Sequence, residues 1–206
     1  MRNLFQDIRY AWRTLSKSPG FTVVAVLTLG LGIGANSTIF SWINSTLLNP
    51  LPGVSDTRGL VTLTRGSSMN DMAFSYPDIR DLREANQSFS GILAFNMLPV
   101  SLTGLGKPER VWATEASANY FDVLGVAPFR GRGFLPVEEQ KPGAAPVAVI
   151  SYGFWQSHFG GRDSAVGQKI NINHHPYTIV GITPPLFQGA QTGLRSDLWI
   201  PLVMQA

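Results

Sequence analysis

The sequence predicts an α+β protein in which one N-terminal transmembrane helix precedes a mixed α/β domain. Two observations carry this prediction. An uncharged window of 38 residues, 18–55, lies between Lys17 and Asp56, and after it short β-rich segments are interrupted by short helical ones. Strands and helices that do not alternate strictly are typical of α+β folds. We therefore expect two parts in different solvents, a membrane helix and a folded domain.

The segment Phe21–Phe40 forms the centre of the uncharged window and is long enough to cross a bilayer. About 20 apolar residues span the ~30 Å hydrocarbon core as a helix. Ten of its twenty residues are Leu, Ile, Val or Phe, and each contributes roughly −0.3 to −0.6 kcal/mol to insertion at the centre of a span. We therefore expect this segment to insert into a membrane.

The ends of this helix are marked by prolines. Ser18-Pro19 is typical of a helix start, and Pro50 ends the helix. A helix from Pro19 to Asn49 is about 46 Å long at ~1.5 Å per residue, which exceeds the thickness of the hydrocarbon core. The predicted membrane helix therefore occupies 18–49, and its polar second half extends out of the bilayer.

Two other interpretations of this segment remain open. A secretory signal peptide has the same charged start and apolar run, and Ala35-Asn36-Ser37 is a small-x-small cleavage site. A core helix of a soluble domain is the second alternative. The apolar pattern continues past the cleavage site to Leu48, and core helices seldom have so long an uncharged run. The retained membrane anchor is therefore favoured.

Positive charge is concentrated before the apolar segment. Residues 1–17 hold four basic residues and one acidic residue, Asp7, for a net charge of +3. The whole chain has 16 Lys+Arg and 13 Asp+Glu, also +3, so residues 18–206 hold 12 of each and are neutral. A neutral domain is not expected to bind nucleic acid. Because basic residues beside a span stay cytoplasmic, we expect a cytoplasmic N-terminus and residues 50–206 in the periplasm.

The basic segment 1–17 also carries apolar residues at helical spacing, Leu4, Ile8, Trp12 and Leu15. This pattern predicts an amphipathic helix on the inner leaflet, with membrane lipid as its partner. A disordered basic segment is the alternative. The chain has no cysteine, which excludes disulfides and thiolate metal sites.

Residues 50–206 are predicted to form the folded periplasmic part. Runs of β-branched and aromatic residues bounded by turn formers predict strands over 59–65, 109–116, 146–151, 167–173, 176–182 and 197–202. The fourth and fifth of these strands are predicted to form a hairpin. Helices are predicted over 76–86, 118–124 and 151–159, and the first begins at the capping box Ser75-Tyr76-Pro77-Asp78.

No pattern predicts a catalytic residue, a cofactor-binding residue or a metal ligand, so we expect a protein that is not an enzyme. Gly30, Gly32 and Gly34 lie inside the apolar run, without a strand before them or a lysine after them. This placement favours a helix-contact face over a phosphate-binding loop. His174 and His175 are adjacent and point to opposite faces of a strand, so we do not expect them to chelate one metal ion.

The other polar groups have structural interpretations. The predicted helix 76–86 is expected to carry a solvated face of mixed charge, formed by Asp78, Asp81, Glu84, Arg80 and Arg83. Ser151 is followed by Tyr152-Gly153, but Val149 stands where a G-x-S-x-G nucleophile elbow has its first glycine. The stretch Arg130-Gly131-Arg132-Gly133 is typical of a turn, and His158 stands alone in the sequence.

Short motifs follow one another along nearly the whole chain. Before residue 53 they are Asp7–Arg13, Lys17–Thr22, Leu29–Asn36 and Leu47–Pro52. In the later part they are Ser75–Asp78, Asn119–Val126, Gly131-Arg132, Val149–Trp155 and Tyr177–Gly181. In this order and spacing they resemble the N-terminal part of MacB-type ABC transporter permeases, most closely the bacterial subgroup in which the permease unit is duplicated.

The resemblance implies a fold and a role. In this family the first span leads into an α+β periplasmic core domain, and a separate cytoplasmic ATPase drives motion that the spans transmit to the periplasm. The chain would then be the membrane-anchored N-terminal part of an ABC-type efflux permease in the bacterial inner membrane. Its implied partners are membrane lipid, a second permease unit and a separate ABC ATPase, which would bind through the missing permease part.

Two departures from the family accompany the resemblance. The chain stops at Ala206, before any second span, so we expect the core domain over 50–206 to be incomplete at its C-terminus. His174 stands in the predicted hairpin turn where the family usually has glycine, and a non-glycine residue with φ > 0 is strained.

Two hypotheses from other classes remain beside the permease. A free-standing membrane-anchored binding or scaffold module in the periplasm would use the same fold to hold a partner. A secreted enzyme released from a signal peptide is the other hypothesis, and the sequence offers no catalytic residues for it.

Overall fold

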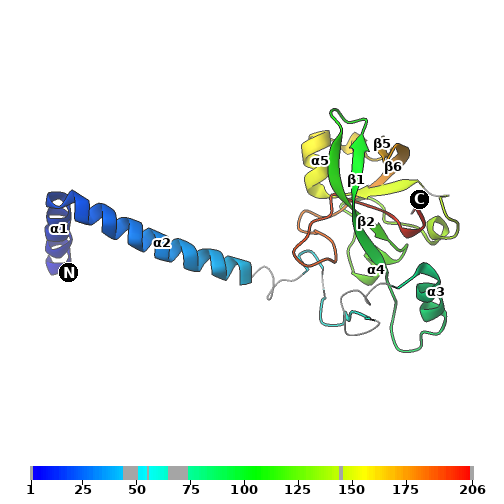
Figure 1. Ribbon diagram of the computed structural model, residues 1–206, viewed down its shortest axis with the longest axis horizontal. Coiled ribbons are helices and arrows are strands. Elements are labelled where there is room, and N and C mark those ends of the chain that lie inside the picture. Colours follow the sequence, from blue (N-terminus) through cyan, green and yellow to red (C-terminus); the bar gives the residue numbers. More distant parts are fainter. Residues whose placement is uncertain (1, 44–50, 55, 65–73, 144–145, 205–206) are drawn as a thin grey trace. The chain divides into compact units, whose positions relative to one another are not determined.

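The computed structural model describes residues 2–43, 51–54, 56–64, 74–143 and 146–204. The chain divides into two compact units, Met1–Pro50 and Leu51–Ala206. The first unit holds two helices, and the second holds a mixed α/β domain (Figure 1).

The N-terminal unit consists of α1, Arg2–Lys17, and α2, Pro19–Ile43. Ser18 joins them, and the Ser18 amide (3.2 Å) and the Thr22 hydroxyl (2.7 Å) both donate to the Leu15 carbonyl. These bonds satisfy a carbonyl that would otherwise lack an intrahelical donor at the end of α1. The basic segment thus forms a helix over Arg2–Lys17. Its Trp12 side chain is 76% exposed.

Helix α2 is predominantly apolar, with Asn36, Ser37 and Thr38 among the polar residues of its second half. Pro19–Ser41 is long and apolar enough to cross a membrane, and its most apolar stretch is not buried against the rest of the protein. Leu31, for example, is 79% exposed. The predicted continuation of this helix to Asn49 falls on residues 44–49, which lie outside the described part of the chain.

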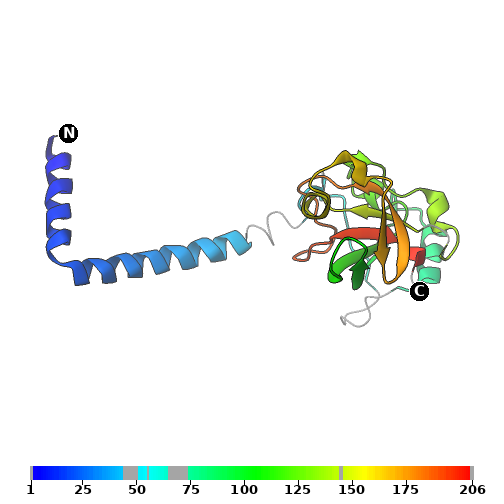
Figure 2. The same ribbon diagram turned by 90° about the horizontal axis from the view of Figure 1, so that it is seen from above.

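The second unit is built around a closed barrel of six strands (Figures 1 and 2). Around the ring lie β6 (His175–Ile182), β4 (Val147–Ile150), β7 (Leu198–Pro201), β2 (Glu109–Ala116), β1 (Phe95–Thr103) and β5 (Lys169–Ile172), after which β5 pairs with β6. A seventh strand, β3 (Arg130–Gly131), pairs with the end of β6. The predicted α+β class is confirmed.

The barrel mixes strand directions. The β2–β7 and β4–β6 pairs are parallel, whereas β1–β2, β1–β5, β4–β7 and β5–β6 are antiparallel. A parallel neighbour requires a crossover, and between β4 and β6 this crossover contains α5, Tyr152–Phe159. The α5 helix begins where the sequence predicts it, at Ser151, whose hydroxyl accepts the Phe154 amide at 3.0 Å.

Alternate side chains of the strands fill the barrel. Inward-facing residues of all six strands form one buried cluster, which includes Val100, Val111, Ile150, Ile170, Ile179 and Leu198. Three residues of α5, Phe154, Trp155 and Phe159, belong to the same cluster. Closing the ring therefore gives these short strands a common core, which no pair of them would have alone.

A second buried cluster covers the outer face of the barrel. Val149 and Trp199, each one residue away from an inward side chain, point outward into it. Helix α4, Tyr120–Val123, packs there through Tyr120 and Phe121. The ring centroids of Phe121 and Trp199 are 5.9 Å apart, and burial raises the pKa of Tyr120 to about 12. The α4 helix is shorter than the predicted 118–124.

The predicted strand over 59–65 is wrong. Residues 59–64 are described and form no strand, and Arg65 lies outside the described residues. Leu60 packs against the outer cluster, but Val61 is 65% exposed. The six-strand ring closes through the β5–β6 pair without this segment, and residues with high β propensity form a strand only where they pair with another strand.

Strand β1 is absent from the sequence predictions, and it contains Pro99. Trp112, opposite Pro99, turns its amide and carbonyl toward Asp197, away from β1. The 99–112 pair is therefore a non-hydrogen-bonded pair of the ladder, and the missing N–H of Pro99 faces the open edge of β1. A proline is tolerated in a strand at such a position.

The predicted hairpin between β5 and β6 is present with a two-residue turn. Ile172 pairs with His175, and the turn residues Asn173 and His174 both have positive φ, 49° and 69°. Positive φ at both central positions is the signature of a type I′ turn. Asn173 also exchanges two hydrogen bonds with the Ser101 backbone, both 2.9 Å, which extends the β1–β5 contact.

Candidate functional site

A junction of polar side chains lies where α3, Tyr76–Glu84, meets the barrel domain. Arg83 donates three hydrogen bonds there: from Nε to the Ile92 carbonyl (2.9 Å), from Nη1 to Glu139 Oε1 (2.9 Å) and from Nη2 to Asn119 Oδ1 (3.2 Å). The Arg83 and Glu139 side chains are 26% and 11% exposed. A partly buried ion pair with several directed hydrogen bonds is stronger than a pair on an open surface.

The acceptors of this junction are themselves held by the domain. The Ala118 amide donates to Glu139 Oε2 (2.8 Å), and the Ser117 hydroxyl donates to Asn119 Oδ1 (2.8 Å). The Asn119 amide group donates to the Ile92 carbonyl (3.1 Å). A cleft of about 240 Å³ opens beside the junction, lined by Arg83, Ala118, Asn119, Asp122, Pro136 and Glu139.

The short helix η3, Pro136–Glu139, presents two adjacent carboxylates in different directions. Glu138 forms a two-point ion pair with Arg132, at 2.7 and 3.0 Å, and accepts the Leu135 amide at 2.8 Å. The hydrogen bonds that Arg132 donates to Glu138 raise the pKa of Arg132, although burial opposes this. The neighbouring carboxylate, Glu139, turns to the α3 junction, so η3 connects the two ion pairs.

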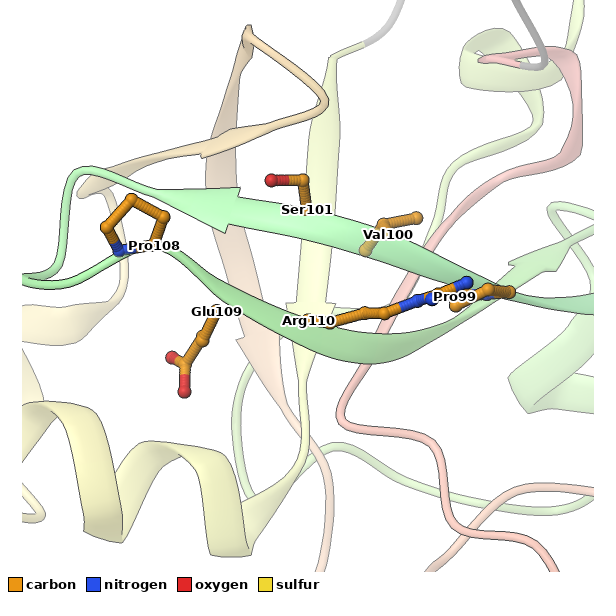
Figure 3. A pocket seen from close by; sticks show the side chains of 6 residues that line it. All are labelled: Pro99, Val100, Ser101, Pro108, Glu109 and Arg110. Atoms are coloured by element: carbon orange, nitrogen blue, oxygen red, sulfur yellow. The ribbon is translucent and has the colours of Figure 1, made fainter.

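A second cleft lies on the β1–β2 hairpin, with a volume of about 300 Å³. Figure 3 shows its lining residues, Pro99, Val100, Ser101, Pro108, Glu109 and Arg110. Glu109 is directed toward α5, where its Oε1 lies 2.6 Å from His158 Nε2. The His158 ring stacks on Phe154 at a centroid distance of 4.0 Å. His158 therefore links α5 to the hairpin.

The segment that enters the domain is seated on the aromatic outer cluster. Gly53 has φ +84°, and a Cβ there would approach the Phe187 Cα at 2.8 Å. Phe187 in turn stacks on Trp199 at 5.3 Å between ring centroids. Only glycine allows this backbone contact at that φ, so the contact at Gly53 helps to fix the beginning of the domain to its core.

The polar residues weighed in the sequence do not converge on one site. His174 occupies the hairpin turn and His158 the hairpin–α5 link, while Ser151 caps α5. Among the described residues no group of three or more His, Cys, Asp or Glu side chains could hold a metal ion. Gly131 has φ +70°, and a Cβ on it would collide with the Val180 carbonyl, so it serves the close β3–β6 contact.

The sequence prediction of a solvated face on α3 holds for one arginine and fails for the other. Arg80 is exposed and forms ion pairs of 3.8 and 3.9 Å with Asp81 and Glu84. Arg83 is part-buried and leaves that face for the junction. The signal was available in the spacing, because Arg83 follows Ile79 by four residues and therefore lies on the apolar side of the helix.

Comparisons with known proteins agree with this architecture. Residues 22–206 match the family described as the MacB-like periplasmic core domain. Two pyoverdine export ATP-binding/permease proteins PvdT, from Pseudomonas syringae pv. syringae and pv. tomato, are 25% and 24% identical over 213 residues. These alignments cover 94% of this chain and 30% of each relative, so the chain spans about a third of the length of the relatives it matches.

Two solved structures share the fold. The periplasmic region of MacB from Actinobacillus actinomycetemcomitans has a TM-score of 0.55 at 16% identity, covering 73% of this chain and 70% of that one. The extracellular domain of the noncanonic ABC-type transporter YknZ from Gram-positive bacteria has a TM-score of 0.51 at 18% identity, covering 64% of each chain. With the family match over residues 22–206, the conclusion is plain: this chain belongs to the MacB-like periplasmic core domain family.

Proposed function

We propose that the chain is the membrane-anchored N-terminal part of an ABC-type efflux permease and transmits ATPase-driven motion to its periplasmic domain. One observation carries the proposal: a single family match runs from within α2 through the whole barrel domain. The apolar helix and the domain therefore recur together in one family. The export function in the names of the relatives supports transport as the activity served.

The proposed topology places α1 in the cytoplasm, α2 across the inner membrane and residues 50–206 in the periplasm. The charge bias of residues 1–17 and the exposed apolar surface of α2 support this orientation. No step of the proposed role is chemical, because the domain's part is mechanical. A separate ABC ATPase, a second permease unit and membrane lipid are the proposed partners.

The topology is tested by cysteine accessibility, for which this cysteine-free chain is suited. Ser164→Cys and Ser16→Cys each place one thiol at an exposed residue, in the domain and in α1 respectively. A membrane-impermeant maleimide should label Ser164→Cys on intact spheroplasts and Ser16→Cys only after lysis. An intact mass lacking about the first 37 residues would show a cleaved signal peptide instead, and the anchor would be excluded.

The partner proposal needs a separate experiment in the cells that make the chain. A tagged chain should co-isolate an ABC ATPase and further permease segments from detergent-solubilised membranes. A stable 206-residue product that recovers one periplasmic protein and no ATPase would support a free-standing binding module. That outcome would overturn the permease proposal while leaving the topology result intact.

A further inference from the structure

The acceptors around Arg83 form a site that the barrel domain builds without help from α3. The three acceptors come from the entry into β1, the turn after β2 and η3, through Ile92, Asn119 and Glu139. Each is already positioned by a donor of the domain, as the bonds from Ala118, Ser117 and Asn119 show. A guanidinium that enters this site does not have to order its partners, which favours binding.

The geometry of the acceptors selects a guanidinium. Arg83 uses Nε, Nη1 and Nη2, so three acceptors lie around one planar group. An ammonium is a compact charge on a flexible stem and does not match such a fixed, planar fork. The site combines one carboxylate with two neutral oxygens, and this charge is complementary to a single cation.

Helix α3 meets the described domain through the polar contacts of this site, while its apolar residues Ile79 and Leu82 are only half-buried. None of its residues is buried, and none belongs to either apolar cluster of the described domain. The Tyr76 hydroxyl adds a hydrogen bond of 3.3 Å to the Glu139 carbonyl. The start of α3 is closed locally, since Ser75 and Asp78 form a reciprocal capping box.

We propose that the barrel domain carries a preformed guanidinium-binding site, which α3 occupies through Arg83 and can vacate as a unit while the barrel stays folded. This inference goes beyond the proposed transport role and does not depend on it. The cleft beside the site, which also includes Asp122, leaves open space next to the bound arginine. When α3 leaves, the vacated site can accept the arginine side chain of another segment.

Hydrogen exchange of the full chain in detergent micelles tests the release of α3. Arg83→Ala should speed exchange of the amides in 75–86 by about tenfold or more, because a hydrogen bond to a charged group contributes about that factor. Exchange in the barrel peptide 109–116 should not change. Arg80→Ala is the matched control, since Arg80 lies on the same helix and contacts only Asp81 and Glu84 in its described ion pairs.

Ligand rescue tests the site itself. Ethylguanidinium added to Arg83→Ala should shift the NMR signals of the Ala118 amide and the Asn119 side-chain amide in a saturable way. Ethylammonium should not, and neither cation should shift them in the wild-type chain, whose site is filled. Arg83→Lys should behave like Arg83→Ala in hydrogen exchange, because an ammonium cannot reach three acceptors.

Three outcomes would overturn the proposal. Equal acceleration of α3 and the barrel would show that α3 is an integral part of one cooperative unit. An equal effect of Arg80→Ala would show that general helix stability matters, not the site. Equal shifts with ethylguanidinium and ethylammonium would show a nonspecific cation effect. If Arg83→Ala does not fold, Glu139→Gln retains the shape of the site. It should release α3 because it removes the carboxylate charge and replaces one of the two accepting oxygens by a donor.

Discussion

Helix α2 and the barrel strands are both rich in apolar side chains. These side chains are exposed in α2 and buried in the barrel. Leu31 of α2 is 79% exposed, whereas Ile179 of β6 and Trp199 of β7 are fully buried. The α2 helix keeps its backbone hydrogen bonds within itself, and the strands obtain theirs from one another. An apolar segment that satisfies its own backbone is suited to lipid, whereas strands require the whole domain.

This difference indicates what a substitution should affect in each region. In the barrel, a buried side chain packs against its neighbours, so its removal should reduce the free energy of unfolding of the domain. In α2, an exposed side chain faces the proposed lipid, so membrane insertion should depend on its polarity and not on its shape. The predictions below test this contrast in order of decreasing effect.

The largest effect is expected for Trp199→Ala, which empties the centre of the outer aromatic cluster. The Trp199 ring contacts both Phe121 and Phe187, and truncation of a buried aromatic residue costs about 3–5 kcal/mol. Urea denaturation of the full chain in micelles, followed by circular dichroism, should show this loss. Leu31→Ala should leave the urea midpoint unchanged. An equal loss of stability in Leu31→Ala would contradict the proposed difference between α2 and the barrel.

The next effect is expected for Leu31→Arg in α2. A cation at the centre of a span costs roughly 3 kcal/mol on insertion scales, so more protein should be extracted from membranes by carbonate. Leu186→Arg is the matched control, because Leu186 is a domain leucine that is 70% exposed. Equal extraction of both variants would mean that exposure alone, and not a membrane position, distinguishes α2.

A pH-dependent effect of about 2–3 kcal/mol is expected from Tyr120. Burial raises its pKa from 10.0 to about 12 in the folded domain. The unfolded chain therefore loses this proton first, so stability is complete below pH 10 and falls as the pH rises toward 12. Urea midpoints between pH 9 and pH 12 should show the fall.

Tyr120→Phe is the control for this slope. Phenylalanine cannot ionise, so the variant should lose the largest part of the alkaline decrease, while its stability at pH 8 falls because the Ala190 amide loses its acceptor. The raised pKa values of Tyr76 and Tyr177 leave a smaller slope in the same direction. An unchanged alkaline slope in Tyr120→Phe would contradict the assignment.

The smallest effect is expected for His174→Gly in the β5–β6 hairpin, and it is a gain. His174 has φ 69°, a conformation that costs a non-glycine residue ~1 kcal/mol, and Asn-Gly is the preferred sequence of a type I′ turn. Part of the gain is offset by the entropy of glycine in the unfolded chain. Thermal unfolding should move up by a few degrees, and a lower midpoint would show that His174 is not strained.

The sequence predicted the elements whose signals are local. The residue patterns placed strands β2, β4, β5, β6 and β7 and helices α3 and α5 correctly. A capping box marks the start of α3, and the Ser151 N-cap marks the start of α5. Strand β1 was missed because Pro99 masks its pattern, and the proline is tolerated only because its side of the ladder is open. The strand predicted over 59–65 failed because its described residues pair with no strand of the barrel.

The junction around Arg83 shows why a site is harder to predict than an element. Its acceptors come from residues 92, 119 and 139, which are separated by up to 56 positions from Arg83. The sequence prediction put Arg83 on the solvated face of α3, although its spacing from Ile79 could have placed it on the apolar side. Nothing local identified its partners. The same holds for Gly53, whose conformation is explained by Phe187, far along the chain.

The sequence by itself determined the apolar helix, the charge bias beside it, the α+β class and the positions of most strands. These follow from hydrophobicity and backbone preference, which act over a few residues. Only the tertiary structure decided that six strands close into a barrel, that Trp199 faces outward, and that Arg83 is held by three segments. Those features depend on contacts between distant residues, because a ring of strands or a set of acceptors exists only after the chain has folded.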